Sequence, residues 1–164
     1  IMKASEALGY EAKLYSDHLC GEARDEAEKL VIHVKQLIAN GIARPVALLA
    51  GGETTVTLKG NGRGGRNQEM ALAFACAAEK HGLTGNWTFL SGGTDGRDGP
   101  TDAAGALVDP DTIQRMRHAG IDPLALLDNN DAYNALKTAG DLLDTGATGT
   151  NVADLQVLLI HPQS

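Results

Sequence analysis

The sequence has few basic residues, and this shortage excludes one broad class of partner. Of its 164 residues, 14 are Lys or Arg and 21 are Asp or Glu, so the formal net charge at pH 7 is -7. A general nucleic-acid binder needs a basic surface that displaces counterions from phosphates. We therefore expect no nucleic-acid partner, although a few arginines in a cleft can still bind a small anion.

Cysteines, metal-type histidines and long apolar runs are also scarce. The two cysteines, Cys20 and Cys76, lie far apart, and the five histidines show no metal-ligand spacing. Cys76 belongs to the apolar run 70–78, which favours a small buried side chain over a reactive thiol. No apolar stretch approaches the ~20 residues that span a bilayer, and no signal segment opens the sequence. These absences indicate a cytoplasmic protein without a membrane partner.

Apolar periodicity predicts an α/β domain. Residues 21–40 and 67–80 are expected to be helices, and the second is apolar on all sides, as in a buried helix. Because hairpin-like and crossover connections both occur, we expect a three-layer α/β/α domain around a mixed sheet. The expected strands are 11–16, 45–50, 55–59, 87–90, 106–108 and 155–160, and the expected short helices are 111–119, 123–127 and 132–138.

The segment 60–70, GNGRGGRNQEM, predicts an anion-binding loop at the start of a helix. Gly62, Gly64 and Gly65 carry no side chains, so backbone amides can approach a phosphate closely. The following helix presents its positive end, and the guanidinium of Arg66 adds a bidentate donor. The glycine spacing also matches the dinucleotide fingerprint, but the strand expected before it is not fully apolar, and no acidic residue stands about 20 residues on. A plain strand-to-helix connection is the structural alternative.

Residues 91–104, SGGTDGRDGPTDAA, gather three aspartates in one loop that follows an expected strand. Carboxylates so placed can hold Mg²⁺ beside a phosphate, and one of them can accept a proton from an attacking hydroxyl. Asp95 and Asp98 form the candidate Mg²⁺ pair, and Asp95 and Asp102 are candidate catalytic groups. Asp-Gly pairs also make simple turns, so a purely structural loop is the alternative.

Two further loops and the start of the second helix carry polar side chains that could reach a ligand. Residues 51–57, GGETTVT, contribute Glu53 and Thr54, and residues 146–154, GATGTNVAD, contribute Asn151. Asn67 completes the predicted phosphate- and substrate-binding set. A turn before the last strand explains Asn151 equally well, and a cap or a pair with a loop arginine is the structural alternative for Glu53.

Together, the segments GGETTVTLKGNGRGGRNQEMALAFA, FLSGGTDGRDGPTDAAGALVD and GTNVADLQVLLI resemble the C-terminal MOFRL domain of bacterial glycerate 2-kinases, a family often named hydroxypyruvate reductase. The resemblance covers about residues 21–160. It implies that residues 1–20 hold the end of a preceding region and the first strand, and that residues 21–164 form the MOFRL-type C-terminal domain. It also implies that a Rossmann-like N-terminal domain, which carries the catalytic lysine, is absent from this chain.

The activity implied by the resemblance is phosphorylation of the 2-hydroxyl of D-glycerate, with ATP and Mg²⁺. Arg66 is then expected to contact the transferring phosphate or the substrate. The implied partners are glycerate, the nucleotide and the missing N-terminal domain, and a homodimer is left open. Two alternatives stand beside it: a hydroxypyruvate reductase that uses NAD(P)H, and an anion-binding module without activity. The isolated chain itself is expected to be inactive.

Overall fold

The computed structural model describes residues 1–162, which form a six-stranded mixed sheet in the order β1-β2-β6-β3-β4-β5. β1 runs parallel to β2, and every other neighbouring pair is antiparallel. The strands are β1 (Glu11–Leu19), β2 (Val46–Gly52), β3 (Trp87–Gly93), β4 (Gly105–Val108), β5 (Leu142–Leu143) and β6 (Asp154–Ile160). The α/β class and the mixed sheet expected from the sequence are confirmed.

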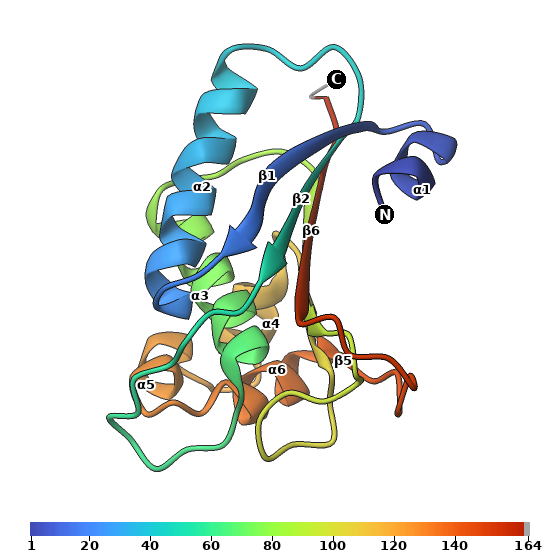
Figure 1. Ribbon diagram of the computed structural model, residues 1–164. Coiled ribbons are helices and arrows are strands. Elements are labelled where there is room, and N and C mark those ends of the chain that lie inside the picture. The colour runs from blue at the N-terminus through green and yellow to red at the C-terminus, as the bar shows by residue number, and fades with distance from the viewer. Residues whose placement is uncertain (163–164) are drawn as a thin grey trace.

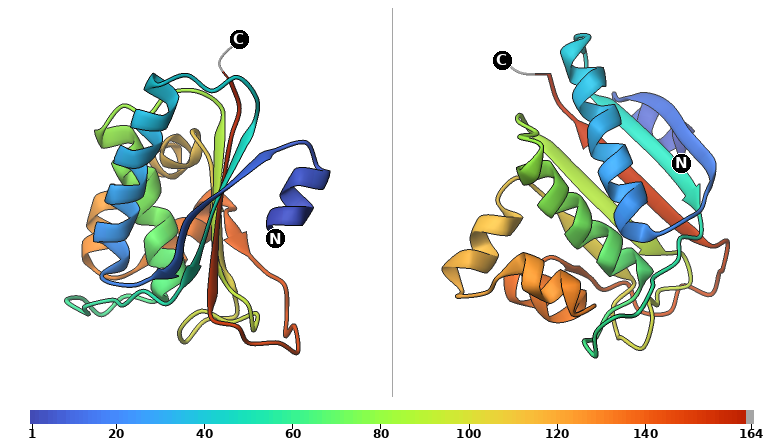
Figure 2. Two further views of the ribbon diagram at one scale, coloured as in Figure 1. Left: turned by 45° about the horizontal axis from the view of Figure 1, so that its top comes forward. Right: turned by 90° about the vertical axis from the view of Figure 1, so that its left-hand side faces the viewer.

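Helices cover the two faces of the sheet unequally (Figures 1 and 2). Helices α2 to α6 lie on one face, whereas α1 is the only helix on the other face within residues 1–162, so the third layer is reduced to this short helix. No helix of this part of the chain combines the length and the apolar character needed to cross a bilayer. The helices are α1 (Met2–Ala7), α2 (Ala23–Ala39), α3 (Arg66–Lys80), α4 (Thr112–His118), α5 (Pro123–Asp128) and α6 (Ala132–Ala139).

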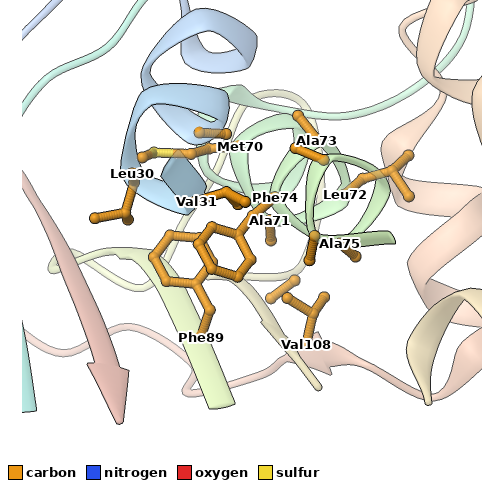
Figure 3. Close-up of a cluster of buried hydrophobic side chains, with 14 of the residues drawn as sticks. Leu30, Val31, Met70, Ala71, Leu72, Ala73, Phe74, Ala75, Phe89 and Val108 are labelled. Carbon is orange, nitrogen blue, oxygen red and sulfur yellow. The ribbon is translucent and has the colours of Figure 1, made fainter. Parts of the chain in front are cut away.

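Helix α3 forms the centre of the core, as its all-round apolar pattern predicts. Every residue from 67 to 75 is buried. The ring of Phe74 stacks on Phe89 of β3 with their centroids 4.3 Å apart, and Trp87 meets Phe74 edge-on. Figure 3 shows this cluster between α2 and the strands, where the small alanines of α3 allow close approach.

The strand expected at residues 55–59 does not form. The amide of Thr57 donates to the carboxylate of Glu22. The amide of Lys59 donates to the side chain of Asn130. Side chains thus take the bonds that a neighbouring strand would have taken, and the alternating pattern of this segment reflects exposure and not sheet pairing.

On the sheet face opposite α2, one apolar side chain from each of five strands stands in a single row. Pairing aligns Leu14 with Leu49, Leu49 with Val157, Val157 with Leu90, and Leu90 with Leu107. We call these five residues the apolar row. Leu14 and Leu107, at its two ends, are exposed. β1 contributes to the row from the same sheet as the later strands, and the domain boundary expected between residues 20 and 21 stays a prediction.

We expect Phe74→Ala to lower the free energy of unfolding by about 3–5 kcal/mol, because it leaves a cavity between α3 and β3. The matched control is Leu124→Ala, whose side chain is 58% exposed; it should change stability by less than about 0.5 kcal/mol. Urea unfolding followed by circular dichroism measures both. Similar losses for the two variants would contradict the central place of Phe74 in the core.

Candidate active site

The loops that follow β2 and β3, the loop that precedes β6 and the glycine loop before α3 meet at one end of the sheet (Figure 1). This follows from the topology, since β6 runs antiparallel to both β2 and β3. The amide of Thr94 donates to the carbonyl of Ala153 at 3.0 Å. The hydroxyl of Thr148 donates to the carbonyl of Thr94 at 2.5 Å. Gly99 packs so closely on Gly64 that a Cβ at Gly99 would overlap the Gly64 backbone.

Arg66 begins α3, and its guanidinium lies between two carboxylates. Its Nε and Nη2 donate to the two oxygens of Asp154 at 2.6 and 3.0 Å. Its Nη1 lies 2.8 Å from Glu53 Oε1. The Asp154 side chain is 1% exposed, whereas that of Glu53 is 62% exposed. The bidentate bond to Asp154 raises the pKa of Arg66 above its usual value and fixes the plane of the guanidinium.

Asp98 caps the start of α3 from within the protein. One carboxylate oxygen accepts from the amide of Asn67 at 3.0 Å, and the other accepts from the amide of Gln68 at 2.8 Å. Burial raises the pKa of Asp98 to about 6, although these amide bonds act in the opposite direction. The positive end of α3 is therefore partly neutralised by a protein carboxylate before any ligand arrives.

The side chain of Asn67 is turned into the protein as well. Its Nδ2 donates to Asp98, and its Oδ1 accepts from the hydroxyl of Ser91 at 2.7 Å. Asn67 is 1% exposed. The structure thus places this predicted binding residue underneath the site, where it joins α3 to β3.

The backbone amides that are open at the glycine loop are confined to its last residues. The amide of Gly62 donates to the carbonyl of Asn129 at 2.9 Å and is not available to a ligand. The amides of Gly64, Gly65 and Arg66 donate no hydrogen bond within residues 1–162. These three consecutive amides, without a protein partner in this part of the chain, lie next to the Arg66 side chain, and of the three residues Arg66 lines the first hollow described below.

Two hollows flank the meeting point of the loops. The first has a volume of about 600 Å³ and the second about 510 Å³. They lie on either side of the consecutive residues Gly99 and Pro100, and together they define the candidate site. The first is lined by Glu53, Thr54, Thr55, Val56, Arg66 and Gly99, and the second by Arg63, Gly96, Arg97, Pro100, Thr101, Asp102, Gly146 and Ala147.

The remaining predicted side chains differ in how open they are. One oxygen of Asp95 accepts from a backbone amide two residues on, and its second oxygen makes no hydrogen bond within the described residues. Asp102 accepts a hydrogen bond from the hydroxyl of Tyr133 at 2.7 Å. This bond lowers the pKa of Asp102, so that the carboxyl is ionised at neutral pH. Asn151 is exposed, and it lines neither hollow. Thr54 is buried at the edge of the first hollow.

The residues that line the two hollows carry three guanidinium groups and two carboxylates. Three further carboxylates stand in the neighbouring loops and at the start of β6, and two of them, Asp98 and Asp154, are buried and hydrogen-bonded to the start of α3. Within residues 1–162, no group of three or more His, Cys, Asp or Glu side chains could hold a metal ion. Mg²⁺ held mainly by phosphate oxygens needs only one or two carboxylates, and the open oxygen of Asp95 fits this role, whereas Asp98 has both oxygens engaged. The carboxylates are Glu53, Asp95, Asp98, Asp102 and Asp154, and the guanidinium groups are Arg63, Arg66 and Arg97.

The fold and the site together define a class: an α/β domain that presents the start of a buried helix, with its arginine, at the strand ends of a mixed sheet. Residues 46–154 match the MOFRL family. This chain belongs to the MOFRL family.

Longer proteins contain the same domain. The chain is 48% identical over 154 residues to the D-glycerate 2-kinase of Thermotoga maritima. This match covers 93% of this chain and 36% of the relative. It is 48% identical over 123 residues to the glycerate kinase of Homo sapiens, covering 73% of this chain and 24% of that protein. It is 44% identical over 167 residues to an Agrobacterium vitis protein named putative hydroxypyruvate reductase, a match that covers 97% of this chain and 37% of that protein.

Solved structures agree with the sequence relatives. The crystal structure of the Thermotoga maritima glycerate kinase matches 96% of this chain with a TM-score of 0.90 and 45% identity, over 38% of its own length. A protein from Pyrococcus horikoshii OT3 matches 98% of this chain with a TM-score of 0.88 and 37% identity, over 37% of its length. The chain thus spans between 24% and 38% of the length of these relatives.

The raised pKa of Asp98 predicts a pH-dependent term in stability. Because the folded pKa of about 6 lies above the ordinary value of 3.8, protonation favours the folded state. The stabilising contribution is complete below pH 3.8 and is lost as the pH rises through about 6.

Asp98→Asn removes this titration. The free energy of unfolding of the unmodified protein minus that of the variant should therefore fall by about 2 kcal/mol between about pH 4.5 and about pH 7. Urea unfolding at a series of pH values measures the difference, in which the other titrating groups cancel. Parallel pH profiles for the two proteins would refute the assignment.

Proposed function

We propose that this chain forms the C-terminal part of an ATP-dependent glycerate 2-kinase and contributes loops for phosphoryl transfer to the 2-hydroxyl of D-glycerate. One observation carries the proposal: a guanidinium fixed beside three open amides, in a chain 48% identical over 154 residues to a D-glycerate 2-kinase. Phosphoryl transfer depends mainly on positioning and on neutralising charge. A fixed guanidinium and aligned amides supply both.

In this proposal, Arg66 is the principal donor to the transferring phosphate or to the substrate. Its bond to the buried Asp154 keeps the guanidinium oriented, while the bond from Nη1 to the exposed Glu53 is the one that a phosphate can replace. The amides of Gly64 and Gly65 add donors on the same side as the helix start. Glu53 would then swing toward solvent or toward a cation of the substrate complex.

In the same proposal, the three aspartates of residues 91–104 have different roles. Asp95 contacts Mg²⁺ carried by the nucleotide, and Asp98 holds α3 in place instead of binding the metal. Asp102 orients the acceptor or its hydroxyl from the second hollow, because an ionised carboxylate with a lowered pKa is a weak general base. Gly62, Thr54 and Asn67 support the shape of the loops, and Asn151 accepts a hydrogen bond from the amide of Ala153 in its own turn.

We also propose that the rest of a longer polypeptide completes the site. One feature of the surface supports this: Leu14 and Leu107, the two ends of the apolar row, are exposed on the sheet face opposite α2. A second domain that packs on the apolar row could bring a lysine toward the strand ends, and the relatives contain the additional length for it.

The nicotinamide-dependent reductase is the competing function, and one relative bears that name. The geometry of the glycine loop argues against it. In a dinucleotide loop the second glycine lets the backbone approach the pyrophosphate, whereas here the second glycine, Gly62, packs on Asn129 and Asp131 and donates its amide to the carbonyl of Asn129. Glycerate-dependent formation of ADP by the full-length polypeptide supports the kinase, and oxidation of NADH by hydroxypyruvate without ATP turnover would support the reductase.

Arg66→Lys tests the role of the guanidinium while keeping a positive charge next to the buried Asp154. We expect kcat for glycerate phosphorylation to fall roughly 100-fold, because an ammonium cannot hold the carboxylate and donate to the phosphate in the same plane. Arg44→Lys, at an exposed ion pair with Glu11, should leave kcat within about twofold. Coupled measurement of ADP reads out both variants, and equal effects would remove the case for Arg66.

A further inference from the structure

The turn between α5 and α6 binds the glycine loop along its backbone. The amides of Lys59 and Gly60 both donate to Asn130 Oδ1, at 2.8 and 2.9 Å. The next three amides also donate to this turn. The amide of residue 61 donates to the side chain of Asn129, and that of residue 62 donates to the backbone carbonyl of Asn129. The amide of residue 63 donates to the side chain of Asp131. Five consecutive amides of the glycine loop are therefore held by three residues, which we call the clamp (129–131).

The first glycines of the loop serve this contact. A Cβ built at Gly60 would overlap the backbone of Asn129, and one built at Gly62 would overlap Asp131. Glycine is required there because two backbones approach each other, and not because a ligand does. The loop is thus divided into a clamped part, 59–63, and the open amides of residues 64–66.

Asn130 is the central residue of the clamp. It is 4% exposed and has a φ of 53°. Its Oδ1 accepts the two loop amides, while its Nδ2 donates to Glu69 Oε2 at 3.0 Å and to the carbonyl of Thr57 at 3.4 Å. Every hydrogen-bonding position of the amide group is in use, which requires a donor and an acceptor on the same short side chain.

Glu69 connects the clamp to the helix that carries Arg66. It is buried in the first turn of α3, and its Oε1 accepts from Arg24 Nε at 2.6 Å. Arg24 also donates to the carbonyl of Leu127 in α5. A continuous chain of hydrogen bonds therefore runs from α2 through α3 and Asn130 to the glycine loop, and its bond between Asn130 and Glu69 is buried.

We propose that Asn130 is a positioning residue, which holds the glycine loop in register with the start of α3 so that the three open amides and Arg66 face the same phosphate. This inference rests on the proposed kinase function. Asn130 touches no substrate in this account. It acts through the backbone of residues 59 and 60 on one side and through Glu69 on the other.

Asn130→Asp is the decisive variant because it keeps the shape and the acceptor of the side chain and replaces its donor by an ionisable oxygen. The introduced carboxyl still accepts the loop amides, but in its ionised form it has no proton for Glu69. The charged groups around it are Glu69 from α3, Arg24 from α2, Asp128 at the end of α5 and Asp131 from the turn, so carboxylates outnumber the single guanidinium. Its pKa should be raised, and its protonated form can again donate to Glu69.

In the full-length polypeptide, we expect Asn130→Asp to lower kcat roughly tenfold or more at about pH 8, with a smaller change in the KM for glycerate. The loss should shrink toward about pH 6 as the introduced carboxyl takes up its proton. Asn130→Gly, which suits the positive φ but lacks the amide, should lose kcat at both pH values. Asn86→Asp, at an exposed position, should follow the unmodified enzyme.

Thermal melting at each pH confirms that the variants are folded during the assays. A merely structural role would lower the melting temperature of Asn130→Asp and leave kcat of the folded enzyme with an unchanged pH profile, and this result would overturn the proposal. So would a kcat equal to that of Asn86→Asp at both pH values.

Hydrogen–deuterium exchange separates failure of this inference from failure of the kinase proposal. At about pH 8, the peptide covering residues 57–65 should exchange roughly tenfold faster in Asn130→Asp than in Asn86→Asp. Equal exchange would overturn the clamp whatever the activity. If the unmodified polypeptide forms no ADP with glycerate, the kinase proposal fails and the positioning role falls with it, while the exchange result still decides whether Asn130 holds the loop.

Discussion

The burial of residues 67–75 in the first turns of α3 determines how the rest of this end of the molecule is built. A helix start exposes amides and side chains that cannot be left without partners inside a protein. Here three polar residues in succession, 67 to 69, are buried, and each makes a side-chain hydrogen bond to another element, although Gln68 Oε1 has no partner within the described residues. Asp98 comes from the loop after β3, Ser91 from β3 itself, and Arg24 from α2. The loops converge on this point because the helix start needs them.

Arg66 follows from the same constraint. It is the one residue at the start of α3 whose side chain leaves the core, and it is oriented by a carboxylate that is itself buried. Isolated buried charges are costly, so Asp154 and Arg66 hold each other in place. The arrangement yields a guanidinium with little rotational freedom and one nitrogen facing an exposed carboxylate. Such a group is suited to exchanging partners without reorganising the protein around it.

The sequence predicted those features that depend on neighbours in the chain. The buried helix at 67–80, the apolar strands and the place of Arg66 at a helix start follow from periodicity and from glycine spacing. It could not identify Asp154 as the partner of Arg66, since the two lie 88 positions apart. A run of Asn and Asp between two short helices was visible, yet its contact with a loop 70 positions away was not.

The glycine loop shows most clearly what the sequence could not predict. Glycine allows a ligand to come close, allows another backbone to come close, or adopts an unusual φ. The sequence does not tell these three roles apart. At Gly60 and Gly62 the close neighbour is protein, whereas at residues 64–66 the amides stay open. The segment 55–59 was misjudged for a related reason, because its alternation carried no information about which group would bind its amides.

The position of β6 within the sheet has a consequence for the order of folding. β6 lies between β2 and β3, so it joins a pair of strands, β1 and β2, to a group of three, β3, β4 and β5. Until residues 154–160 have left the ribosome, these two groups have no strand in common, and each presents an unpaired edge. The sheet, and with it the bond between Asp154 and Arg66, can close only after nearly all of this domain has been synthesised. Between the synthesis of β2 and that of β6, the edge of β2 that β6 will pair with has no strand partner in this sheet.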